Sequence, residues 1–406
     1  MRFRHRDGTV VHLSYCTNVH PAEDLAGIRA QLADCAEPVR ERLGTGLLGL
    51  GLWLPHDAAT ALAADPAAPA RLRADLTARG LEVVSLNGFP YEGFHAPVVK
   101  HAVYSPDWAD PRRLAYTLDL ARVLAELLPD DAARGSVSTL PFGWRTAWTA
   151  GRRDAVRRNL EALAEGLRRI EAETGRRIRV GLEPEPGCAA ETVRQALDGL
   201  AGTDHTHLGL CLDACHLAVA HEDPAGAVAD CAAAGVPVVK LQASAALQAD
   251  RPRDPATRAG LAPFAEPRFL HQTREAGAPD TPAAHRFAAT QDDPAARDDL
   301  PQALDPADGL PGDAPWRIHY HVPLHADPEP PLRSTRSVLS ETLHTLFAGP
   351  RAVTDHVEVE TYTWSVLPED RRPGDASGGL PAGIAAELDH ARRELTALGL
   401  RQEDHR

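Results

Sequence analysis

Eight short apolar runs, separated by segments with helical periodicity, restrict the folds open to this chain. Near-continuous apolar runs of this kind are typical of parallel strands that are buried on both faces of a sheet. Because strands and helices alternate, the sequence predicts βαβ units, and eight such units close into a (β/α)8 barrel. We therefore expect an α/β fold with a single TIM-barrel domain over residues 1–406. The runs occupy residues 11–18, 47–54, 81–88, 135–142, 178–185, 207–214, 237–244 and 356–363.

An open, doubly wound sheet is the main alternative to the barrel. The dinucleotide-binding members of that class carry a G-x-G-x-x-G motif after the first strand. The sequence has no such motif after residues 11–18. Eight runs also exceed the roughly five or six strands usual in such a sheet. The closed barrel is therefore the preferred fold.

Several segments between the runs carry helix signals. Residues 154–175 place apolar side chains on one stripe, with Asp154 as the expected N-cap and Gly175 as the expected stop. Asp110 and Pro111 predict the start of a second helix that ends near Pro129. Further helices are expected at about 22–42, 191–200, 224–234, 334–347 and 381–398.

The connection between the seventh and eighth runs is too long to be an ordinary loop. Much of residues 246–331 is rich in Pro, Ala and Asp, so we expect an insertion or lid that is partly flexible. Within it, residues 267–273 and 316–325 are expected to pair as a hairpin. The aromatic-rich connection after residues 81–88 is expected to fold over one end of the barrel.

Composition narrows the class of partner. The formal net charge of −14 argues against a nucleic-acid-binding surface, which normally carries a basic patch. No apolar run approaches the roughly 18–20 residues that span a bilayer, and residues 1–16 lack the apolar core of a secretion signal. Six cysteines in so long a chain suggest reduced thiols. We therefore expect a cytoplasmic protein that binds a small molecule.

Acidic side chains stand at the ends of three runs: Glu183 in the fifth, Asp213 in the sixth and Glu360 in the eighth. In a (β/α)8 barrel the carboxyl ends of all strands meet at one rim, where active sites lie. Carboxylates gathered there repel one another, and a divalent cation is the simplest compensation. The sequence therefore predicts a site for Mg²⁺, Mn²⁺, Co²⁺ or Zn²⁺, with no sharp preference among them.

Single residues in this set have structural explanations as well. Asp213 is also suited to cap the helix that follows it. Lys240, in the seventh run, is placed either to bind a phosphate or carboxylate of a substrate or to pair with a barrel carboxylate. His319 and His321 are two residues apart, so in a strand they would share a face, either in the pocket or packed within the hairpin.

The pattern of Glu ending the fifth strand, Asp-x-x-His at the sixth and Glu ending the eighth resembles the xylose-isomerase-like superfamily. That superfamily includes sugar isomerases, sugar-phosphate epimerases and endonuclease IV-type enzymes. The resemblance implies metal ligands at Glu183, Asp213, Glu360 and the end of the seventh strand. There this chain has Gln242, where the superfamily usually has histidine. Either Gln242 binds the cation through its carbonyl oxygen, or a histidine of the insertion (His271, His319 or His321) completes the site.

A narrower resemblance rests on segments scattered over the whole chain. Together they are similar to the EboE family of metabolite traffic proteins. That resemblance implies a role in moving a metabolite or its precursor toward the cell envelope, alongside other pathway proteins, and implies no particular reaction. The segments are HLSYCTNVHP, LNGFPYEGFH, VYSPDW, GLEPEPGC, LDACHLAV, WRIHYHVPL and HVEVETYTW.

The superfamily resemblance also implies a reaction, a metal-assisted proton shuttle beside a substrate carbonyl. Glu183 and Glu360 would remove and return the proton, and are the expected catalytic residues. His216 would orient a substrate hydroxyl. The other expected substrate contacts are Asn18, His20, Asn87, His95, Glu185, Lys240, His319 and His321.

Three functions are therefore in competition. The first is an isomerase or epimerase that acts on a sugar-like metabolite. The second is a carrier that kept the pocket and lost turnover, which Gln242 and the lid-like insertion favour. The third is an endonuclease IV-like nuclease, which would need three metals, further histidines and a basic surface; the net charge of −14 argues against it.

Overall fold

The computed structural model describes residues 1–277, 295–372, 374 and 378–403. Across these residues, eight parallel strands form a closed barrel, because the last strand pairs back with the first. This confirms the predicted (β/α)8 architecture. The barrel strands are β2 (Val10–Cys16), β3 (Leu48–Trp53), β4 (Leu81–Asn87), β5 (Gly135–Thr139), β6 (Ile178–Leu182), β7 (Leu208–Asp213), β8 (Val238–Ala243) and β14 (His356–Val359).

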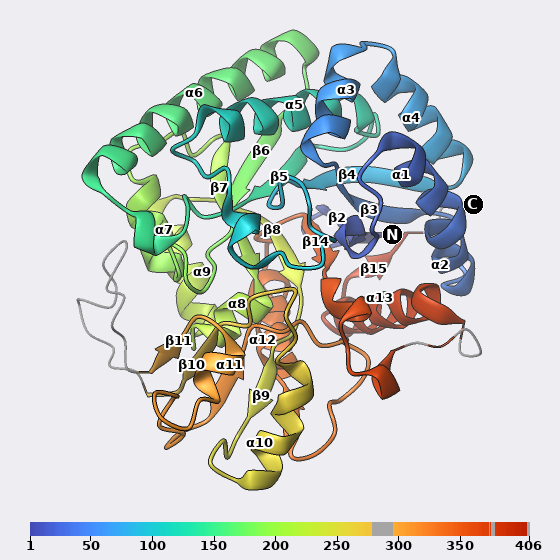
Figure 1. Cartoon of the computed structure of the whole chain (residues 1–406). Helices are drawn as coiled ribbons and strands as arrows, with labels where there is room; N and C mark the ends of the chain where they lie inside the picture. The colour runs from blue at the N-terminus through green and yellow to red at the C-terminus, as the bar shows by residue number, and fades with distance from the viewer. Residues whose placement is uncertain (278–294, 373, 375–377, 404–406) are drawn as a thin grey trace.

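The helices form an outer ring around the barrel (Figure 1). Two short strands, β1 (Arg2–Arg4) and β15 (Arg401–Gln402), extend the sheet beyond β2 in antiparallel pairing. The ring comprises α1 (Leu25–Gln31), α2 (Glu37–Arg42), α3 (His56–Ala64), α4 (Ala68–Ala78), α5 (Pro111–Leu127), α6 (Ala150–Thr174), α7 (Val193–Leu200), α8 (Ala214–Val219), α9 (Pro224–Ala234), α12 (Arg336–Phe347) and α13 (Gly379–Ala397).

Helix ends follow their capping residues. The side chain of Asp110 accepts a hydrogen bond from the Arg112 amide, as expected for α5. Gly175 ends α6 with a φ of 70°, a left-handed conformation that suits glycine. The predicted cap of α6 is wrong: Thr149, rather than Asp154, caps the helix. Both residue types are good N-caps, and the sequence does not separate them.

The helix expected at 22–42 is divided. A π-helical turn at Leu32–Ala36 separates α1 from α2. The short helix α8 begins directly after Asp213, which caps it in the way considered from the sequence. The two helices α3 and α4 were not predicted. Their Ala-rich sequences lack a clear apolar stripe.

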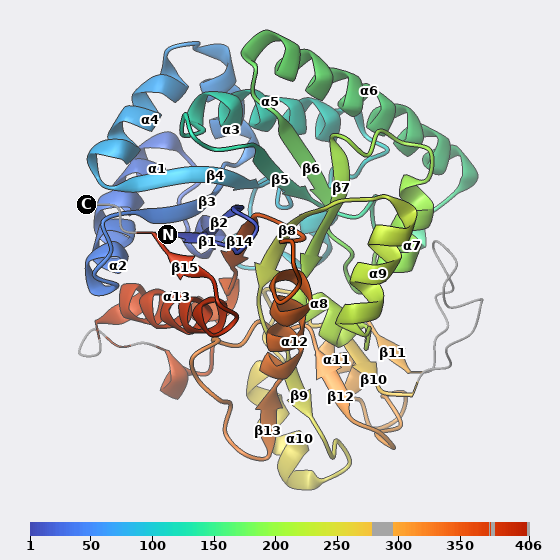
Figure 2. The same ribbon diagram turned by 180° about the vertical axis from the view of Figure 1, so that it is seen from behind.

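The insertion after β8 builds a second sheet. Among the described residues it has five strands in the order β11-β10-β12-β9-β13, and Figures 1 and 2 show it on one side of the barrel, next to α8. The expected pairing of its two ordered segments is confirmed, because Thr273 of β10 lies opposite Ile318 of β12. The bounds are β9 (Leu247–Ala249), β10 (Thr273–Glu275), β11 (Ala296–Arg297), β12 (Trp316–Ile318), β13 (Leu332–Ser334), α10 (Pro255–Leu261) and α11 (Leu300–Ala303).

Part of the expected flexibility of this insertion falls on residues 278–294, which lie outside the described residues. All six cysteines are buried free thiols. In the part of the chain that the structure describes, no helix is both long and apolar enough to cross a bilayer.

A charged pair fills the centre of the barrel. The Nζ atom of Lys240 lies 3.0 Å from Glu358 Oε1 and donates to Ser85 Oγ at 2.8 Å. Both charged side chains are fully buried. Space for the glutamate comes from Gly51 of β3, because a Cβ atom there would lie 1.8 Å from Glu358 Oε2. The glycine therefore permits a buried ion pair.

We expect Gly51→Ala to lower the free energy of unfolding by about 3 kcal/mol, because Glu358 must move and its pairing with Lys240 weakens. Urea unfolding measures this change. The matched control is Gly151→Ala in the first turn of α6, where an added Cβ meets nothing within 4 Å. The control should change stability by no more than about 0.5 kcal/mol. Equal stability of the two variants would contradict the proposed packing.

Candidate metal centre and binding pocket

Three strands deliver carboxylates to one point of the barrel rim. Glu183 directly follows β6, Asp213 ends β7 and Glu360 directly follows β14. One oxygen of each lies within 4.8 Å of the others, and all three side chains are buried. The structure therefore brings together the three acids that the sequence singled out.

Two amides orient the Glu360 carboxylate. Its Oε1 atom accepts hydrogen bonds from Asn18 Nδ2 at 2.7 Å and from Asn87 Nδ2 at 2.9 Å. Asn18 follows β2 and Asn87 ends β4, so both come from the same rim. Amide donors stabilise the charged form of a carboxylate without adding charge of their own.

Asp213 serves two purposes at once. Its Oδ1 atom accepts from the backbone N–H of His216 at 2.9 Å, which caps α8, and from the Ser244 hydroxyl at 2.8 Å. The other oxygen, Oδ2, is buried and has no hydrogen-bond partner among the described residues. Glu183 Oε2 is likewise buried without a hydrogen-bond partner among the described residues. Buried oxygens without donors are costly unless something else satisfies them.

The carboxylate charges at this rim repel one another. Burial, with repulsion from Glu360 and Asp213, raises the pKa of Glu183 well above its usual value. Burial and the neighbouring acids Asp213 and Glu358 raise the pKa of Glu360 to about 8. Three clustered carboxylates with spare oxygens match the oxygen-rich ligand sets of divalent cations. The residues present therefore fit a divalent metal.

Gln242 lies at the corresponding end of β8, opposite Asp213 in the strand register. Its side chain is fully buried, and neither atom of its amide has a hydrogen-bond partner within the described residues. The amide oxygen is thus free to bind a cation. Lys240, two residues earlier on the same face, points into the barrel below it.

The insertion carries histidines to the same rim. His321 Nε2 lies 4.0 Å from Asp213 Oδ2 and has no hydrogen-bond partner in the described chain. His319 lies beside His216 of α8, with ring centroids 4.6 Å apart. Both nitrogens of His271 have partners elsewhere, Glu266 and the His319 carbonyl. His271 therefore differs from His321, whose Nε2 atom has no hydrogen-bond partner in the described chain.

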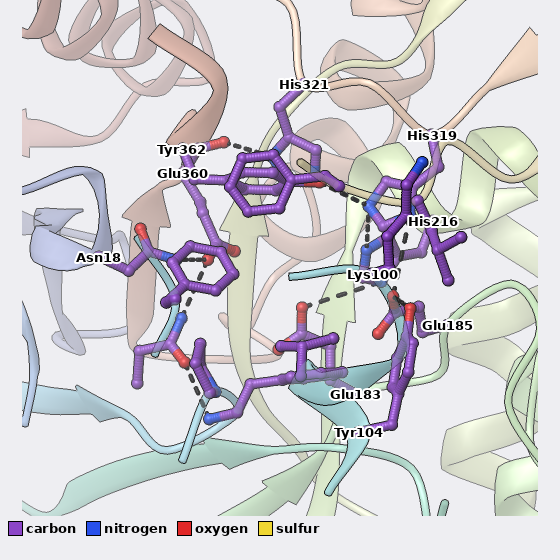
Figure 3. Close-up of a pocket in the computed structure, with 17 residues that line it drawn as sticks. Asn18, Lys100, Tyr104, Glu183, Glu185, His216, His319, His321, Glu360 and Tyr362 are labelled. Atoms are coloured by element: carbon purple, nitrogen blue, oxygen red, sulfur yellow. Dashed lines mark hydrogen bonds and ion pairs between the residues drawn. The ribbon is translucent and has the colours of Figure 1, made fainter. Parts of the chain in front are cut away.

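A pocket opens above the carboxylates. Figure 3 shows Glu183, Glu185, Glu360 and the histidines pointing toward the same space. Polar groups therefore gather at one end of the pocket and aromatic rings form much of its wall. The lining includes Asn18, Asn87, Phe89, Phe94, Lys100, Tyr104, Glu183, Glu185, His216, Phe269, His319, His321, Glu360 and Tyr362.

Three predicted substrate contacts are placed outside this lining. His20 is buried against the Tyr15 hydroxyl, with Nε2 at 3.1 Å. His95 bonds the backbone carbonyl of Asn18 at 2.7 Å and so supports a residue of the site. Lys240 is held by Glu358 and Ser85 in the barrel centre, which agrees with the alternative that it pairs with a barrel carboxylate. Asp213 and Gln242 also lie outside the lining.

Sequence reasoning missed several pocket residues. Tyr104 donates to Glu185 Oε1 at 2.6 Å and accepts from Gln272 Nε2, so it positions an acid of the rim. Its burial, with the nearby Glu185, raises the pKa of Tyr104 well above its usual value. Tyr362 follows Glu360 by two residues, and Lys100 pairs with Asp299 of the insertion at 2.5 Å. The aromatic-rich connection after β4 was the signal for this wall.

Comparison with known proteins identifies the family. The family model described as a xylose isomerase-like TIM barrel matches residues 41–266, which include the ends of β6, β7 and β8. The chain belongs to this family. No protein with a curated description matches the sequence.

Solved structures similar to this xylose isomerase-like barrel include three enzymes or probable enzymes. One is a putative sugar phosphate isomerase/epimerase from Anabaena variabilis, at 14% identity over 96% of this chain and 99% of that one, with a TM-score of 0.47. L-ribulose 3-epimerase is 14% identical over 97% and 99%, with a TM-score of 0.45. The probable 3-DHS dehydratase AsbF of Bacillus anthracis is 12% identical over 94% and 97%, with a TM-score of 0.44.

We expect Lys240→Met to destabilise the protein by about 3–5 kcal/mol, because it leaves Glu358 buried without its cation. The double variant Lys240→Met/Glu358→Met removes both charges and should regain most of that loss. Chemical unfolding of the two variants makes the comparison. If the single variant kept its stability and lost only ligand affinity, Lys240 would instead be a substrate contact.

Proposed function

We propose that this protein is a metal-dependent isomerase or epimerase acting on a small polyhydroxylated metabolite, such as a sugar. The observation that carries the proposal is the cluster of Glu183, Asp213 and Glu360, whose oxygens lie within 4.8 Å of one another beneath an open pocket. Membership of the xylose isomerase-like family supports it. Structural neighbours named as sugar epimerases are consistent with the same class of substrate.

Three side chains would hold the divalent ion, Mn²⁺, Mg²⁺, Co²⁺ or Zn²⁺: Glu183, Asp213 and Glu360. Gln242 or a histidine of the insertion would complete the site. When bound, the ion supplies Lewis acidity toward a carbonyl or hydroxyl of the substrate. The free oxygens of Glu183 and Asp213 support this assignment.

Proton transfer would fall to Glu183 and Glu360, which come from different strands. A general base works best when its pKa is near the working pH, and the pKa of Glu360 is raised to about 8 by burial and neighbouring acids. Asn18 and Asn87 hold the Glu360 carboxylate in place through two hydrogen bonds. One glutamate would remove a proton beside the carbonyl and the other would return one.

The remaining pocket residues suit a hydroxylated ligand. Glu185 and His216 offer hydrogen bonds to hydroxyl groups near the carboxylate cluster. Phe89, Phe94 and Phe269 provide an apolar wall for the carbon skeleton. Such a division of polar and apolar surface is common in sites for small metabolites.

A non-catalytic carrier is the second candidate. It is favoured by Gln242, a neutral residue at a strand end where superfamily relatives are expected to carry a histidine. The resemblance of scattered segments to the EboE family supports a place in a metabolite traffic pathway under either candidate. Six buried free thiols are consistent with a reducing, cytoplasmic location.

We expect the purified protein to retain a divalent ion, and Glu183→Gln and Asp213→Asn to weaken its binding by about 100-fold or more, because each removes a charged ligand. Equilibrium dialysis with Mn²⁺ and elemental analysis measure this. The control is Glu222→Gln, a carboxyl that accepts from the Val193 amide and stands outside the cluster. The affinity of the Glu222→Gln variant for Mn²⁺ should be unchanged. Wild-type protein that holds no ion would contradict the proposal.

Turnover is tested by exchange with solvent. Pentoses and hexoses in aldose and ketose form are incubated in D₂O, and deuterium at the carbon beside the carbonyl is detected by NMR. Glu360→Gln should lower the exchange rate by about 10²–10⁴-fold. A sugar that binds without any exchange would support the carrier instead.

Metal binding should depend on pH in a defined direction. Without a cation, Glu360 keeps its proton near neutral pH, since its pKa moves from 4.5 to about 8. Affinity should therefore rise with pH up to about 8, and binding should release protons, which calorimetry in two buffers detects. The raised pKa also means that the metal-free fold loses stability as pH rises from 4.5 through 8. Melting scans at pH 5.5 and 8.5, with and without Mn²⁺, measure this effect. Mn²⁺ should raise the melting temperature more at pH 8.5 than at pH 5.5.

A further inference from the structure

Three buried polar side chains converge at one end of the pocket, beside the carboxylate cluster. They belong to Glu185, which follows β6, to His216 of α8 and to His319, which follows β12 of the insertion. One nitrogen or oxygen atom of each lies within 4.8 Å of the other two, and all three side chains are buried. Figure 3 shows them pointing into the same space. The proposed function leaves open which chemical group of a ligand they meet.

The backbone fixes the tautomer of His216. The Nδ1 atom of this ring lies 2.9 Å from the Pro184 carbonyl oxygen. A carbonyl oxygen only accepts hydrogen bonds, so Nδ1 must carry the hydrogen of the neutral ring. The Nε2 atom of His216 is therefore a hydrogen-bond acceptor.

Gln272 of the insertion makes the other two side chains acceptors as well. Its Nε2 atom donates to the Pro186 carbonyl and to the Tyr104 hydroxyl, both at 2.9 Å. Because a carbonyl cannot donate, the amide cannot be turned around, and its Oε1 atom must accept from His319 Nδ1 at 2.8 Å. His319 Nε2 is then an acceptor. The Tyr104 hydroxyl already accepts from Gln272, so it must donate to the Glu185 carboxylate, at 2.6 Å from Oε1.

These assignments leave two lone pairs facing each other. His216 Nε2 and His319 Nε2 lie 3.1 Å apart, although neither atom carries a hydrogen. The Tyr362 hydroxyl, at 3.5 Å from His319 Nε2, is too far for a good hydrogen bond. Buried acceptors without a donor are costly, so the pair needs donors from a ligand.

The rest of the pocket wall has few donors to offer a ligand. The side-chain amides of Asn18 and Asn87 donate to Glu360. Within the described chain, Lys100 is the one Lys or Arg side chain that lines the pocket, and its Nζ atom pairs with Asp299 at 2.5 Å. The pocket therefore presents acceptors and negative charge, which disfavours a phosphate or carboxylate on the ligand.

We propose that Glu185, His216 and His319 bind a primary ammonium group, and that the metabolite is an amino sugar or an aminated polyol. An ammonium group has three N–H donors and no acceptor, whereas a hydroxyl has one donor and lone pairs of its own. Hydrogen bonds of about 2.7–3.2 Å from one nitrogen reach acceptors at these separations. The positive charge also strengthens the hydrogen bond to the Glu185 carboxylate. The subsite rests on the proposed function for the polyhydroxylated skeleton of the ligand.

Glucamine and sorbitol form a matched pair of probes for this subsite. Glucamine is sorbitol with one terminal hydroxyl replaced by an amino group, which is protonated at neutral pH. Isothermal titration calorimetry of the wild-type protein, with and without Mn²⁺, measures both affinities. Glucamine should bind at least about 30-fold more tightly than sorbitol, because its charged group makes the stronger hydrogen bonds. Sorbitol phosphate should bind more weakly than sorbitol.

Two variants each remove one acceptor of the subsite. In Glu185→Gln and in His319→Leu, the preference for glucamine over sorbitol should fall to about 3-fold or less, because the charged hydrogen bonds are lost. The matched control is His325→Leu, which removes an exposed histidine outside the pocket lining and should keep the wild-type preference. Circular dichroism establishes that each variant is folded.

The outcomes separate the subsite from the proposed function. A preference for glucamine in a protein that shows neither metal binding nor exchange with solvent would keep the subsite and overturn the metal-dependent isomerase. Glucamine that binds no better than sorbitol, or not at all at millimolar concentration, would overturn the subsite whether or not exchange occurs. An unchanged preference in both Glu185→Gln and His319→Leu would place the amine elsewhere and would also overturn it.

Discussion

Repulsion among buried carboxylates at the barrel rim is the constraint on which the site depends. Ligand oxygens of Glu183, Asp213 and Glu360 lie within 4.8 Å of one another, and all three side chains are buried. Each charge there lacks the solvation that would normally stabilise it. The surrounding groups respond to this: Asn18 and Asn87 donate to Glu360, and Ser244 donates to Asp213. Donors satisfy some of the oxygens, and Glu183 Oε2 and Asp213 Oδ2 have no hydrogen-bond partner among the described residues.

Buried charges also interact in the barrel centre, below the rim. Lys240 is fully buried, and although burial opposes its charge, the Glu358 carboxylate raises its pKa. The positive charge of Lys240 also acts on the rim, where it lowers the pKa values of Glu183 and Glu360 against the larger effect of burial. Gly51 permits this arrangement by leaving space for Glu358. The ion pair therefore supports both the packing of the barrel and the charge of its rim.

Much of this architecture follows from sequence periodicity, since all eight barrel strands fall within the predicted runs or begin one residue before them. Glu183, Asp213 and Glu360 could be recognised because strand ends of a closed barrel must converge. The second sheet could not be recognised from the sequence, because its strands have only two or three residues and pair across long stretches of chain. His20 and His95 show another limit: a sequence gives their neighbourhood but not the side toward which each ring turns.

The insertion adds imidazole side chains to the wall of the pocket. The eight strands alone place acids and Gln242 at the rim, a set of oxygen donors; β12 and the chain after it add His319 and His321. Their position depends on anchors, among them Glu275, which accepts from three backbone amides at residues 312–314 and from the Trp316 indole. Lys100 joins the pocket wall to Asp299 of the insertion. Because these two side chains come from the second sheet, they line the pocket only when the insertion is docked on the barrel. Docking of the insertion therefore determines whether the pocket carries nitrogen groups as well as carboxylates.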